Sequence, residues 1–386
     1  MGKPLSAYFN ILRMRLAMRR GRTRVRHHPI MAQMDPVLLC NLRCPACPTG
    51  LRLNQRPGGR MPWERFREFL DEHGRYLFRL KLYNFGEPLL HKDTPEMLAY
   101  AKSFGIRCEI STNLSLELSD DYLERLVRSG LDLMTVSVDG TSQETYERYR
   151  RRGEFALVRR NLERIRAIKE RLGIGSPWIT WQFLVFRHNE HEIEVIRENY
   201  KKWGADALVV APAQLPVGEH REGFEPSTIP EFVFSPEGPP VAAEQDEQTA
   251  PADTAAPSLP EVARPEPCSW LHGAMVLNGD GMVSPCCATS DSNDDFGEFV
   301  ADREAGRDVW NSASYQRARA VFEPGSQQEA APDAPGDLIC SRCPMPTERD
   351  LVTRLVHEVR GELLADFREN RSVGSLVRFA LTGALL

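Results

Sequence analysis

A repeated alternation of short strand-like and longer helix-like segments is the feature that most constrains the fold of this 386-residue chain. Between Pro29 and Pro212, β-branched and aromatic runs alternate with stretches whose apolar residues recur at helical spacing. The strand candidates are residues 30–39, 78–85, 106–112, 133–139, 178–186 and 207–211, and the helix candidates are 62–73, 94–104, 119–129, 154–172 and 190–203. Six such units predict a parallel sheet with helices outside, because parallel strands need crossover connections.

We expect these units to form an open, partial (β/α)6 TIM-like barrel in an α/β chain, and a flat doubly wound sheet is the alternative. In either fold, chemistry takes place at the carboxyl ends of the strands. Composition predicts five regions: a basic amphipathic N-terminal segment (1–29), the barrel (30–215), a Pro/Ala/acid-rich disordered insert or linker (216–267), a small β-hairpin/helix module (268–350) and a C-terminal helical tail (351–386).

The overall composition is that of an ordinary globular chain. With 41% hydrophobic residues the chain can bury a large core, and a net charge of −5 gives no reason to expect a nucleic-acid partner. Nine cysteines without a secretory signal indicate a reducing cytoplasm, where clustered thiols bind metal more often than they cross-link.

In the first 29 residues, arginines interrupt every apolar run, so this segment has neither a signal-peptide core nor a membrane span. Two interpretations remain open. The segment is either a helix packed on the barrel with its arginines in solvent, or a basic amphipathic helix that contacts a membrane surface or an anionic partner.

Three cysteines, Cys40, Cys44 and Cys47, follow the first strand candidate in the stretch CNLRCPAC, and no fourth cysteine lies nearby. Structural zinc takes four ligands, and a disulfide takes two thiols. A cubane iron–sulfur cluster takes one thiolate per iron, so three cysteines leave one iron open to a small molecule. A zinc site completed by His91 or a distant cysteine is the alternative, although we expect His91 to be a surface residue.

This loop resembles the CxxxCxxC signature of the radical S-adenosylmethionine (radical SAM) enzymes. The stretch YNFGEPLLH at 83–91 is similar to their Gly-Gly-Glu-Pro segment, with Phe85 in place of the first glycine. The resemblance implies that Cys40, Cys44 and Cys47 ligate a [4Fe–4S] cluster whose fourth iron binds S-adenosylmethionine. It also implies a 5′-deoxyadenosyl radical that takes hydrogen from the substrate, and an electron donor such as flavodoxin or ferredoxin.

The same resemblance implies further cofactor contacts. Gly86, Glu87 and Pro88 would line the site of the methionine amino group. Asn113 in STN and Ser137 in SVDG would contact the ribose and carboxylate of S-adenosylmethionine. The alternative for Asn113 and Ser137 is that they merely end strands, since small polar residues favour such positions.

A second cysteine set, Cys268, Cys286, Cys340 and Cys343, lies outside the barrel. Four thiols suit either a closed zinc site or a fully ligated [4Fe–4S] cluster. Beside the radical SAM signature, the set looks like a twitch or shortened SPASM module, which implies one auxiliary cluster. Cys287 is an alternative ligand to Cys286. A fully ligated cluster suits electron transfer, and a purely structural role is the other interpretation.

Three functions are compatible with these motifs. The first is oxidation of a small molecule such as a sugar or an aminocyclitol, because alcohol-oxidising relatives carry a similar single set of four cysteines. The second is a peptide-modifying maturase, although only about 30 residues precede the first strand, too few for a leader-binding winged-helix module. The third is a non-enzymatic iron–sulfur or zinc sensor or scaffold, which the intact Gly-Glu-Pro and cysteine loops disfavour.

Overall fold

The computed structural model describes residues 3–53, 56, 59–213, 225–233, 268–300, 309–322, 338–342, 351–370, 374 and 377–378. Nine strands in this part of the chain form one sheet, in the order β6-β5-β4-β3-β2-β1-β7-β8-β9. They are β1 (Met31–Met34), β2 (Arg79–Lys81), β3 (Arg107–Thr112), β4 (Leu133–Ser137), β5 (Trp178–Val185), β6 (Ala207–Pro212), β7 (Ala274–Leu277), β8 (Met282–Ser284) and β9 (Gly297–Glu298). The first six pair in parallel in sequence order, which confirms the predicted α/β partial barrel.

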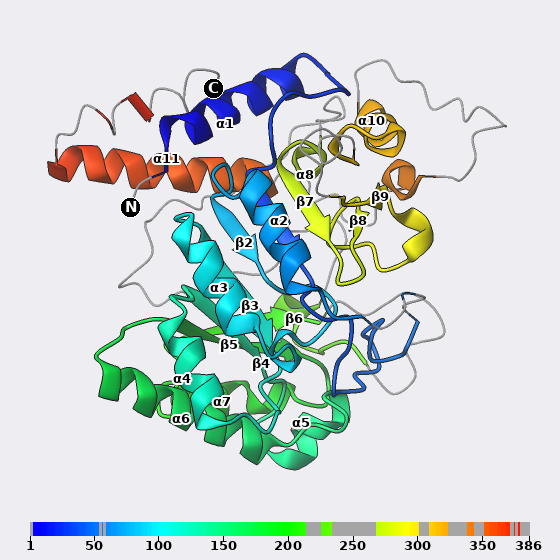
Figure 1. Cartoon of the computed structure of the whole chain (residues 1–386). Coiled ribbons are helices and arrows are strands. Elements are labelled where there is room, and N and C mark those ends of the chain that lie inside the picture. The colour runs from blue at the N-terminus through cyan, green and yellow to red at the C-terminus, as the bar shows by residue number, and fades with distance from the viewer. Residues whose placement is uncertain are drawn as a thin grey trace.

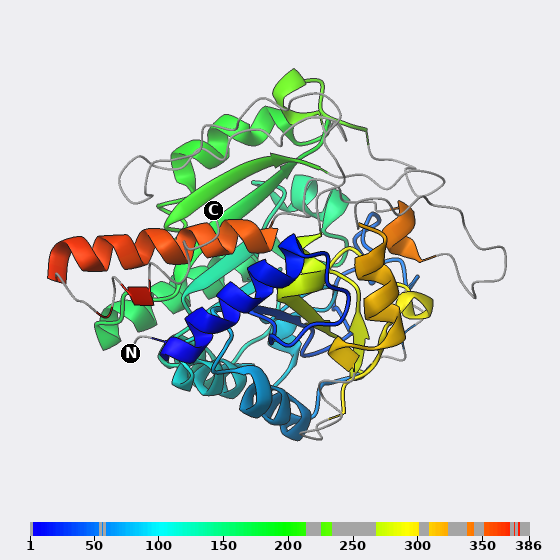
Figure 2. The ribbon, with the colours of Figure 1, turned by 90° about the horizontal axis from the view of Figure 1, so that it is seen from above.

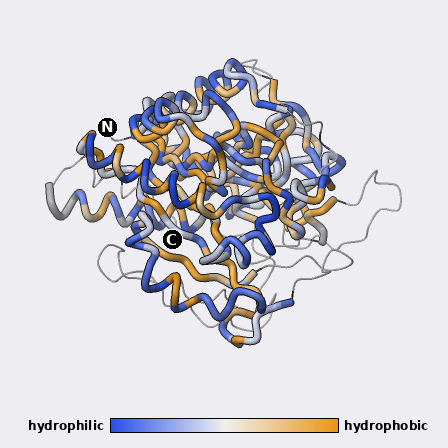
Figure 3. The backbone as a smooth tube through the Cα atoms, turned by 90° about the horizontal axis from the view of Figure 1, so that it is seen from below, coloured by the Kyte–Doolittle hydropathy of each residue, from blue (hydrophilic) through white to orange (hydrophobic). Residues whose placement is uncertain are grey.

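Helices alternate with these strands and cover the outside of the curved sheet (Figure 1). Figure 3 shows hydrophilic and hydrophobic segments alternating along the chain, as expected where helices bury one face each. The barrel helices are α2 (Trp63–His73), α3 (Thr94–Ser103), α4 (Asp120–Arg128), α5 (Gln143–Tyr149), α6 (Phe155–Leu172) and α7 (Ile193–Asn199). The remaining ones are α1 (Leu5–Arg19), α8 (Ser269–Gly273), α10 (Ala313–Ala320) and α11 (Leu351–Asn370).

The first two strands are shorter than predicted, for identifiable reasons. Residues 30–39 contain only the four residues of β1, because Pro36 has no N–H for a strand ladder. Leu38 N instead donates to Gly59 O at 2.9 Å. Residues 78–85 contain only the three residues of β2, because the N–H groups of Asn84 and Phe85 donate to a side-chain carboxylate described below.

The pattern of apolar residues missed one helix of the barrel, α5. Its seven residues are mostly polar, so they show little periodicity. A start signal is nevertheless present, because the Ser142 side chain accepts a hydrogen bond from Thr145 N and Glu144 lies in the first turn.

The predicted hairpin is present beyond the barrel. β7 pairs in parallel with β1, and β8 returns antiparallel to β7. The turn lies at the expected Asn278–Gly281, where Gly281 N donates to Asn278 O at 2.8 Å. β9 extends the sheet antiparallel to β8. The hairpin module therefore continues the barrel sheet through β1.

At the amino ends of the strands, away from the cysteine loop, α1 and α11 lie beside one another in both views (Figures 1 and 2). Both pack on α8. A Cβ placed on Gly273, the last residue of α8, would lie 2.8 Å from Met14 Sδ of α1 and 2.2 Å from Val352 Cγ1 of α11. A close approach of three helices thus requires the absence of a side chain at this glycine.

The insert predicted as disordered, 216–267, lies mostly outside the described residues, but part of it is folded. Residues 225–233 pack on the barrel, with Phe232 buried. The carboxylate of Glu190 accepts hydrogen bonds from Ser227 Oγ and Thr228 N, each at 2.7 Å. A buried aromatic ring and satisfied backbone groups explain why this short stretch differs from the prediction.

No helix in the described ranges has the length and apolar composition needed to cross a lipid bilayer.

Candidate functional site

The three cysteines of the first loop lie between β1 and α2, at the carboxyl ends of the parallel strands. Cys44 is buried beside Tyr149 and Phe186, and Cys40 and Cys47 pack against the same apolar cluster. Cys47 N donates to Cys44 O at 3.2 Å, which fixes a tight turn between two of the thiols. The three thiols therefore share one apolar wall, which limits the access of water.

Nitrogen donors approach two of the sulfur atoms. Leu42 N donates to Cys40 Sγ at 3.4 Å, and Asn113 Nδ2 donates to the same atom at 3.7 Å. Arg150 Nη1 lies 3.9 Å from Cys44 Sγ. Hydrogen bonds and positive charge at sulfur stabilise its negative form and tune any metal that it binds.

The Gly-Glu-Pro segment is fixed by the buried carboxylate of Glu87. Glu87 Oε1 accepts hydrogen bonds from Thr112 Oγ1 at 2.6 Å and Leu89 N at 3.1 Å. Glu87 Oε2 accepts one from Asn113 N at 2.8 Å. Burial raises the pKa of Glu87 to about 7, and these donors oppose the rise. The carboxylate joins the segment after β2 to the end of β3.

A second buried carboxylate, Asp35, holds the same segment from the side of β1; the sequence analysis did not single it out. Asp35 Oδ1 accepts hydrogen bonds from Asn84 N at 2.8 Å and Gly86 N at 3.2 Å, and Oδ2 accepts one from Phe85 N at 2.9 Å. A Cβ on Gly86 would lie 1.6 Å from Val37 O, so only glycine fits there.

The two predicted strand-end residues have different surroundings. Asn113 is buried against the cysteine loop, where its Nδ2 also donates to Asn41 Oδ1 at 3.0 Å. Ser137 is buried at the end of β4, and its Oγ donates to Gln182 Oε1 of β5 at 3.2 Å. The structure therefore brings Asn113 into contact with both the cysteine loop and the Gly-Glu-Pro segment, whereas the side chain of Ser137 forms a hydrogen bond with the neighbouring strand β5.

A buried ion pair beside Cys44 also escaped the sequence analysis. Arg150 Nε donates to Asp139 Oδ2 at 2.6 Å, and Asp139 Oδ1 accepts from Leu184 N at 2.7 Å. Burial alone would lower the pKa of Arg150, but Asp139 and Cys44 raise it well above its ordinary value. Arg150 therefore places a permanent positive charge next to a thiol. Asp139 lies within SVDG, so that motif offered a partial signal.

The expectation that His91 lies on the surface is wrong. His91 is buried, with Nε2 3.1 Å from Met61 O and Nδ1 accepting from Asp93 N at 3.2 Å. Burial lowers its pKa. Both ring nitrogens already have protein partners, because the 3-10 turn that follows Glu87 directs the ring toward Met61, just before α2.

The second cysteine set is described for three of its four predicted members. Cys268 is the N-cap residue of α8, Cys286 follows β8, and Cys340 lies in a short 3-10 helix at 339–342. Burial raises the pKa of Tyr315 in α10, and Cys340 and Cys286 add to the rise, so both thiols lie near its phenol. Cys343 lies outside the described residues.

The neighbouring cysteines Cys286 and Cys287 have different surroundings. Cys286 Sγ lies 3.8 Å from Thr289 Oγ1 and, as above, near the same tyrosine as Cys340. Cys287 instead influences Tyr83, whose pKa is raised by burial, then by Glu109 and Cys287. Of the two, Cys286 therefore shares its surroundings with Cys340.

Within the described residues, no three His, Cys, Asp or Glu side chains form a group suited to a single metal ion. A cubane cluster poses a different requirement, because each thiolate binds its own iron at a separate corner. Three thiols on one apolar wall, with N–H donors at sulfur, fit that donor set. Burial raises the pKa of Cys40 to about 12, so a metal cation would have to displace the thiol proton for Cys40 to serve as a ligand.

Comparison with known proteins identifies two families in this chain. The radical SAM superfamily matches residues 36–198, and the SPASM iron–sulfur cluster-binding domain matches residues 268–344. The chain is 29% identical to the AdoMet-dependent heme synthase of Methanosarcina barkeri over 172 residues, 44% of this chain and 47% of the relative. The match thus spans about half of that relative's length.

A longer match is to the PqqA peptide cyclase of Granulibacter bethesdensis, 26% identical over 301 residues, 73% of this chain and 74% of the relative. Among solved structures, Streptococcus suis SuiB is similar in fold, with a TM-score of 0.53 at 16% identity over 77% of this chain and 68% of SuiB. The chain therefore contains a radical SAM domain followed by a C-terminal SPASM iron–sulfur domain, whose cofactors are a [4Fe–4S] cluster with S-adenosylmethionine and an auxiliary iron–sulfur cluster.

Proposed function

We propose that this enzyme is an oxidoreductase that removes two electrons from a small hydroxylated molecule of the sugar or aminocyclitol kind. When bound, S-adenosylmethionine and the barrel cluster would supply the radical chemistry that removes one hydrogen atom from the substrate, and the second electron and the second proton would pass to the auxiliary cluster and to solvent. The loss of two electrons and two protons in total converts an alcohol into a carbonyl. A flavodoxin or ferredoxin is the proposed electron donor.

The main support for this proposal is that the cysteine loop, the Gly-Glu-Pro segment and the end of β3 meet at Asn113. The side chain of Asn113 contacts Cys40, and its backbone N–H donates to Glu87. One residue at the end of β3 thus holds the cysteine loop and the Gly-Glu-Pro segment together. In our proposal Cys40, Cys44 and Cys47 hold the barrel cluster, and S-adenosylmethionine lies beside Gly86, Glu87, Pro88, Asn113 and Ser137.

The remaining residues of the site would orient the cofactor and exclude water. Tyr149 and Phe186 form the apolar wall behind the thiols, and their ring centroids are 4.5 Å apart. The charge of Arg150 would stabilise thiolate at Cys44. In the outer module, Cys268, Cys286 and Cys340, with Cys343 as the predicted fourth ligand, would hold the auxiliary cluster.

Anaerobic reconstitution with iron, sulfide, S-adenosylmethionine and dithionite tests the proposal. We expect about eight irons per chain and the formation of 5′-deoxyadenosine. Asn113→Ala should lower the rate of 5′-deoxyadenosine formation about tenfold or more while iron content is kept. The control is Asn199→Ala, since Asn199 Nδ2 donates to Val195 O in an exposed hydrogen bond on α7. Equal rates in the Asn113→Ala protein and the parent would refute the assigned role.

A peptide is the second candidate substrate, and one observation favours it. The match to a PqqA peptide cyclase extends over 73% of this chain, which is longer than either of the two domain matches alone. A true substrate gives up a hydrogen atom that ends up in the 5′-deoxyadenosine formed. Deuterated cyclitols and deuterated short peptides should therefore be compared for transfer of deuterium into 5′-deoxyadenosine. Transfer from peptides alone would replace the small-molecule proposal.

We also propose that α1 docks the enzyme on an anionic membrane surface. The inner face of α1 is buried through Ala7, Ile11 and Met14. Its outer face carries Leu5 and Phe9, which are 45% and 47% exposed. These two residues are one turn apart, so they form an apolar stripe that no described part of the chain covers.

Charge supports a lipid surface as the occupant of this stripe. The first 34 residues contain seven arginines, one lysine and no acidic residue. Arg13 is exposed one turn beyond Phe9 on α1, and Arg19 and Arg20 are exposed at the carboxyl end of the helix. An apolar stripe flanked by arginines is typical of helices that lie in the interface of anionic bilayers.

Flotation with lipid vesicles tests this docking. The full chain should float with phosphatidylglycerol vesicles and not with phosphatidylcholine vesicles, and salt should weaken the binding. Phe9→Ser should abolish most of the binding, whereas Val195→Ser, which alters an equally exposed apolar residue on α7, should not. Unchanged flotation of the Phe9→Ser protein, or elution of the parent as a dimer that covers α1, would overturn the proposal.

A further inference from the structure

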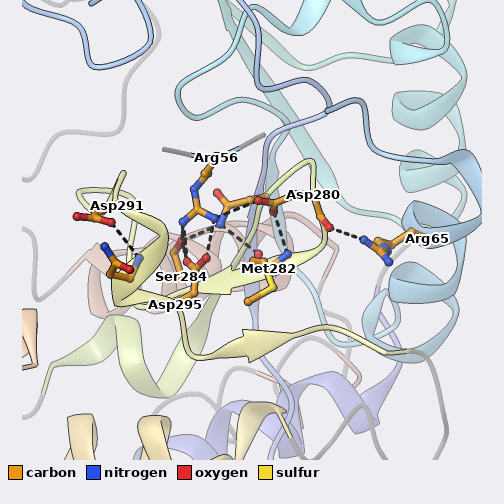
Figure 4. Close-up of polar contacts among 9 residues, drawn as sticks. Arg56, Arg65, Asp280, Met282, Ser284, Asp291 and Asp295 are labelled. Atoms are coloured by element: carbon orange, nitrogen blue, oxygen red, sulfur yellow. Dashed lines mark hydrogen bonds and ion pairs between the residues drawn. The ribbon is translucent and has the colours of Figure 1, made fainter. Parts of the chain in front are cut away.

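A buried arginine of the barrel lies inside the hairpin module. Arg56 follows Cys47 by nine residues and belongs to the segment between the cysteine loop and α2. Its side chain is only 1% exposed, and it is surrounded by residues of the hairpin (Figure 4). An arginine of the segment that follows one cysteine loop is therefore desolvated by the module that carries the other cysteine set.

The partners of Arg56 form a matched set. Its Nη1 and Nη2 donate to the two carboxylate oxygens of Asp295 at 2.7 and 2.6 Å, a bidentate pair. Nη1 also donates to Asp280 Oδ2 at 3.3 Å, and Nη2 donates to Ser284 Oγ at 3.0 Å. Asp295 raises the pKa of Arg56 although burial opposes this. The guanidinium is thus held in one orientation.

The network continues to the cysteines of the hairpin. Ser284 Oγ donates to Asp295 Oδ1 at 2.8 Å and accepts from Asn278 Nδ2 at 2.7 Å. Ser284 is the last residue of β8, two residues before Cys286. A change in the position of Arg56 would therefore shift the end of β8, which leads directly to Cys286.

On the barrel side, the described residues between Cys47 and Arg56 are held by backbone hydrogen bonds. Leu51 N donates to Cys47 O at 2.9 Å, and Leu53 N donates to Pro48 O at 2.9 Å. Successive turns of this kind hold residues 47–53, and Arg56 follows Leu53 by three residues, so its reach from these turns is short. A shift of the cysteine loop therefore moves Arg56, and the reverse holds.

Simple attachment of the module does not require this contact. The parallel pairing of β1 with β7 already joins the two domains. On the outside, Arg65 of α2 donates to Asp280 O at 2.7 Å and pairs with Glu298 in a largely exposed position. Arg56 differs because it acts on the ends of both cysteine loops, and its burial makes its geometry strict.

We propose that Arg56 is a positioning residue that sets the placement of the two cysteine loops relative to one another, through Asp295 and Ser284. The inference rests on the proposed function, since the loops matter as the sites of the two clusters. In the protein without clusters, the coupling is a property of the chain itself and is measurable there.

Hydrogen exchange of the protein without clusters is the first test. Arg56→Lys retains the charge and removes the bidentate geometry. It should accelerate exchange about tenfold in both 44–53 and 282–289, while β3 to β5 keep the parent rates. Asp295→Asn, which preserves volume, should act on the same two segments. Arg65→Gln is the control and should alter neither. Acceleration in 282–289 alone would reduce Arg56 to a local staple and overturn the proposal.

The second test uses the reconstituted enzyme. With iron content equal in parent and variants, the magnetic interaction between the two reduced clusters, measured as broadening of their electron paramagnetic resonance signals, should change in Arg56→Lys and not in Arg65→Gln. Identical broadening in all three proteins would overturn the proposal. A parent protein that binds no second cluster would instead contradict the proposed function, and the exchange result would stand separately.

Discussion

The barrel site and the hairpin module are held in different ways. In the barrel, buried side chains from separate strand ends tie the cysteine loop to the Gly-Glu-Pro segment, with Asp35, Glu87 and Asn113 each making several hydrogen bonds. The module joins the barrel through the β1–β7 pairing, the buried Arg56 and other contacts such as that of Arg65 with Glu298. The barrel site therefore has redundant polar contacts between its strand ends, whereas Arg56 ties the hairpin to the segment after the cysteine loop through one buried ion pair with Asp295.

The largest loss of stability that we predict comes from a steric change in the barrel site, because redundant hydrogen bonds cannot compensate for a clash. Gly86→Ala places a methyl group on Val37 O, a backbone atom that cannot move aside. We expect a loss of about 5 kcal/mol or more of unfolding free energy, or no folded protein at all. Gly361→Ala on α11 meets nothing within 4 Å and should stabilise the chain by about 1 kcal/mol. Urea unfolding measures both, and a mild effect of Gly86→Ala would contradict the backbone geometry.

The next prediction concerns the two arginines of the module boundary. Arg56→Met leaves Asp295 buried without its partner and should cost about 3–5 kcal/mol of unfolding free energy. Arg65→Gln removes an exposed pair and should cost less than about 1 kcal/mol. Replacing Asp295 by Leu together with Arg56→Met should recover part of the loss. Similar costs for Arg56→Met and Arg65→Gln would contradict the predicted difference between the buried and the exposed ion pair.

A polar change in the barrel site should have a smaller effect than Arg56→Met. Asp35→Asn turns one acceptor into a donor facing backbone N–H groups and removes a charge, for a cost of about 1–3 kcal/mol. Glu87 still holds the segment from β3, so the fold should persist. Chemical denaturation provides the value. A cost above that of Arg56→Met would mean that the polar contacts of the barrel site are not redundant.

Acid should weaken the region where α8 meets the N-terminal segment, with a modest effect. His272 is faced by His27 and Arg319, and burial, then Arg319, lowers its pKa to about 3. Because the unfolded chain takes up a proton below the ordinary value of 6.5 and the folded chain does not, stability falls as pH drops through 6.5. Between pH 7.5 and 5.5, His272 should account for a loss of about 1.4 kcal/mol. His272→Gln should reduce the measured loss by that amount, and an unaltered pH dependence would exclude this source.

Local pattern predicted most of the barrel. The strands β3 to β6 end close to the predicted residues, and most of their residues alternate between buried and partly exposed, which is the pattern that predicts a strand. The hairpin turn was readable from Asn278-Gly279. The cysteine and Gly-Glu-Pro motifs were also readable because each lies within a few consecutive residues.

The residues that the sequence did not reveal act over long separations. Asp35 acts on residues about 50 positions away, and Arg56 meets Asp295 across 239. No local pattern marks such an aspartate or arginine, because its role depends on which loops the folded chain brings together. The burial of His91 escaped for the same reason, since its partner Met61 comes from a different turn.

The packing of α1 and α11 on Gly273 has a mechanical consequence. Gly273 links α8 to β7, and β7 leads into the turn that receives Arg56. A force applied to α1 or α11, such as the pull of an attached surface, would be transmitted through Gly273 to β7 and the hairpin. The two terminal helices are thereby mechanically linked to the segment that carries Cys286.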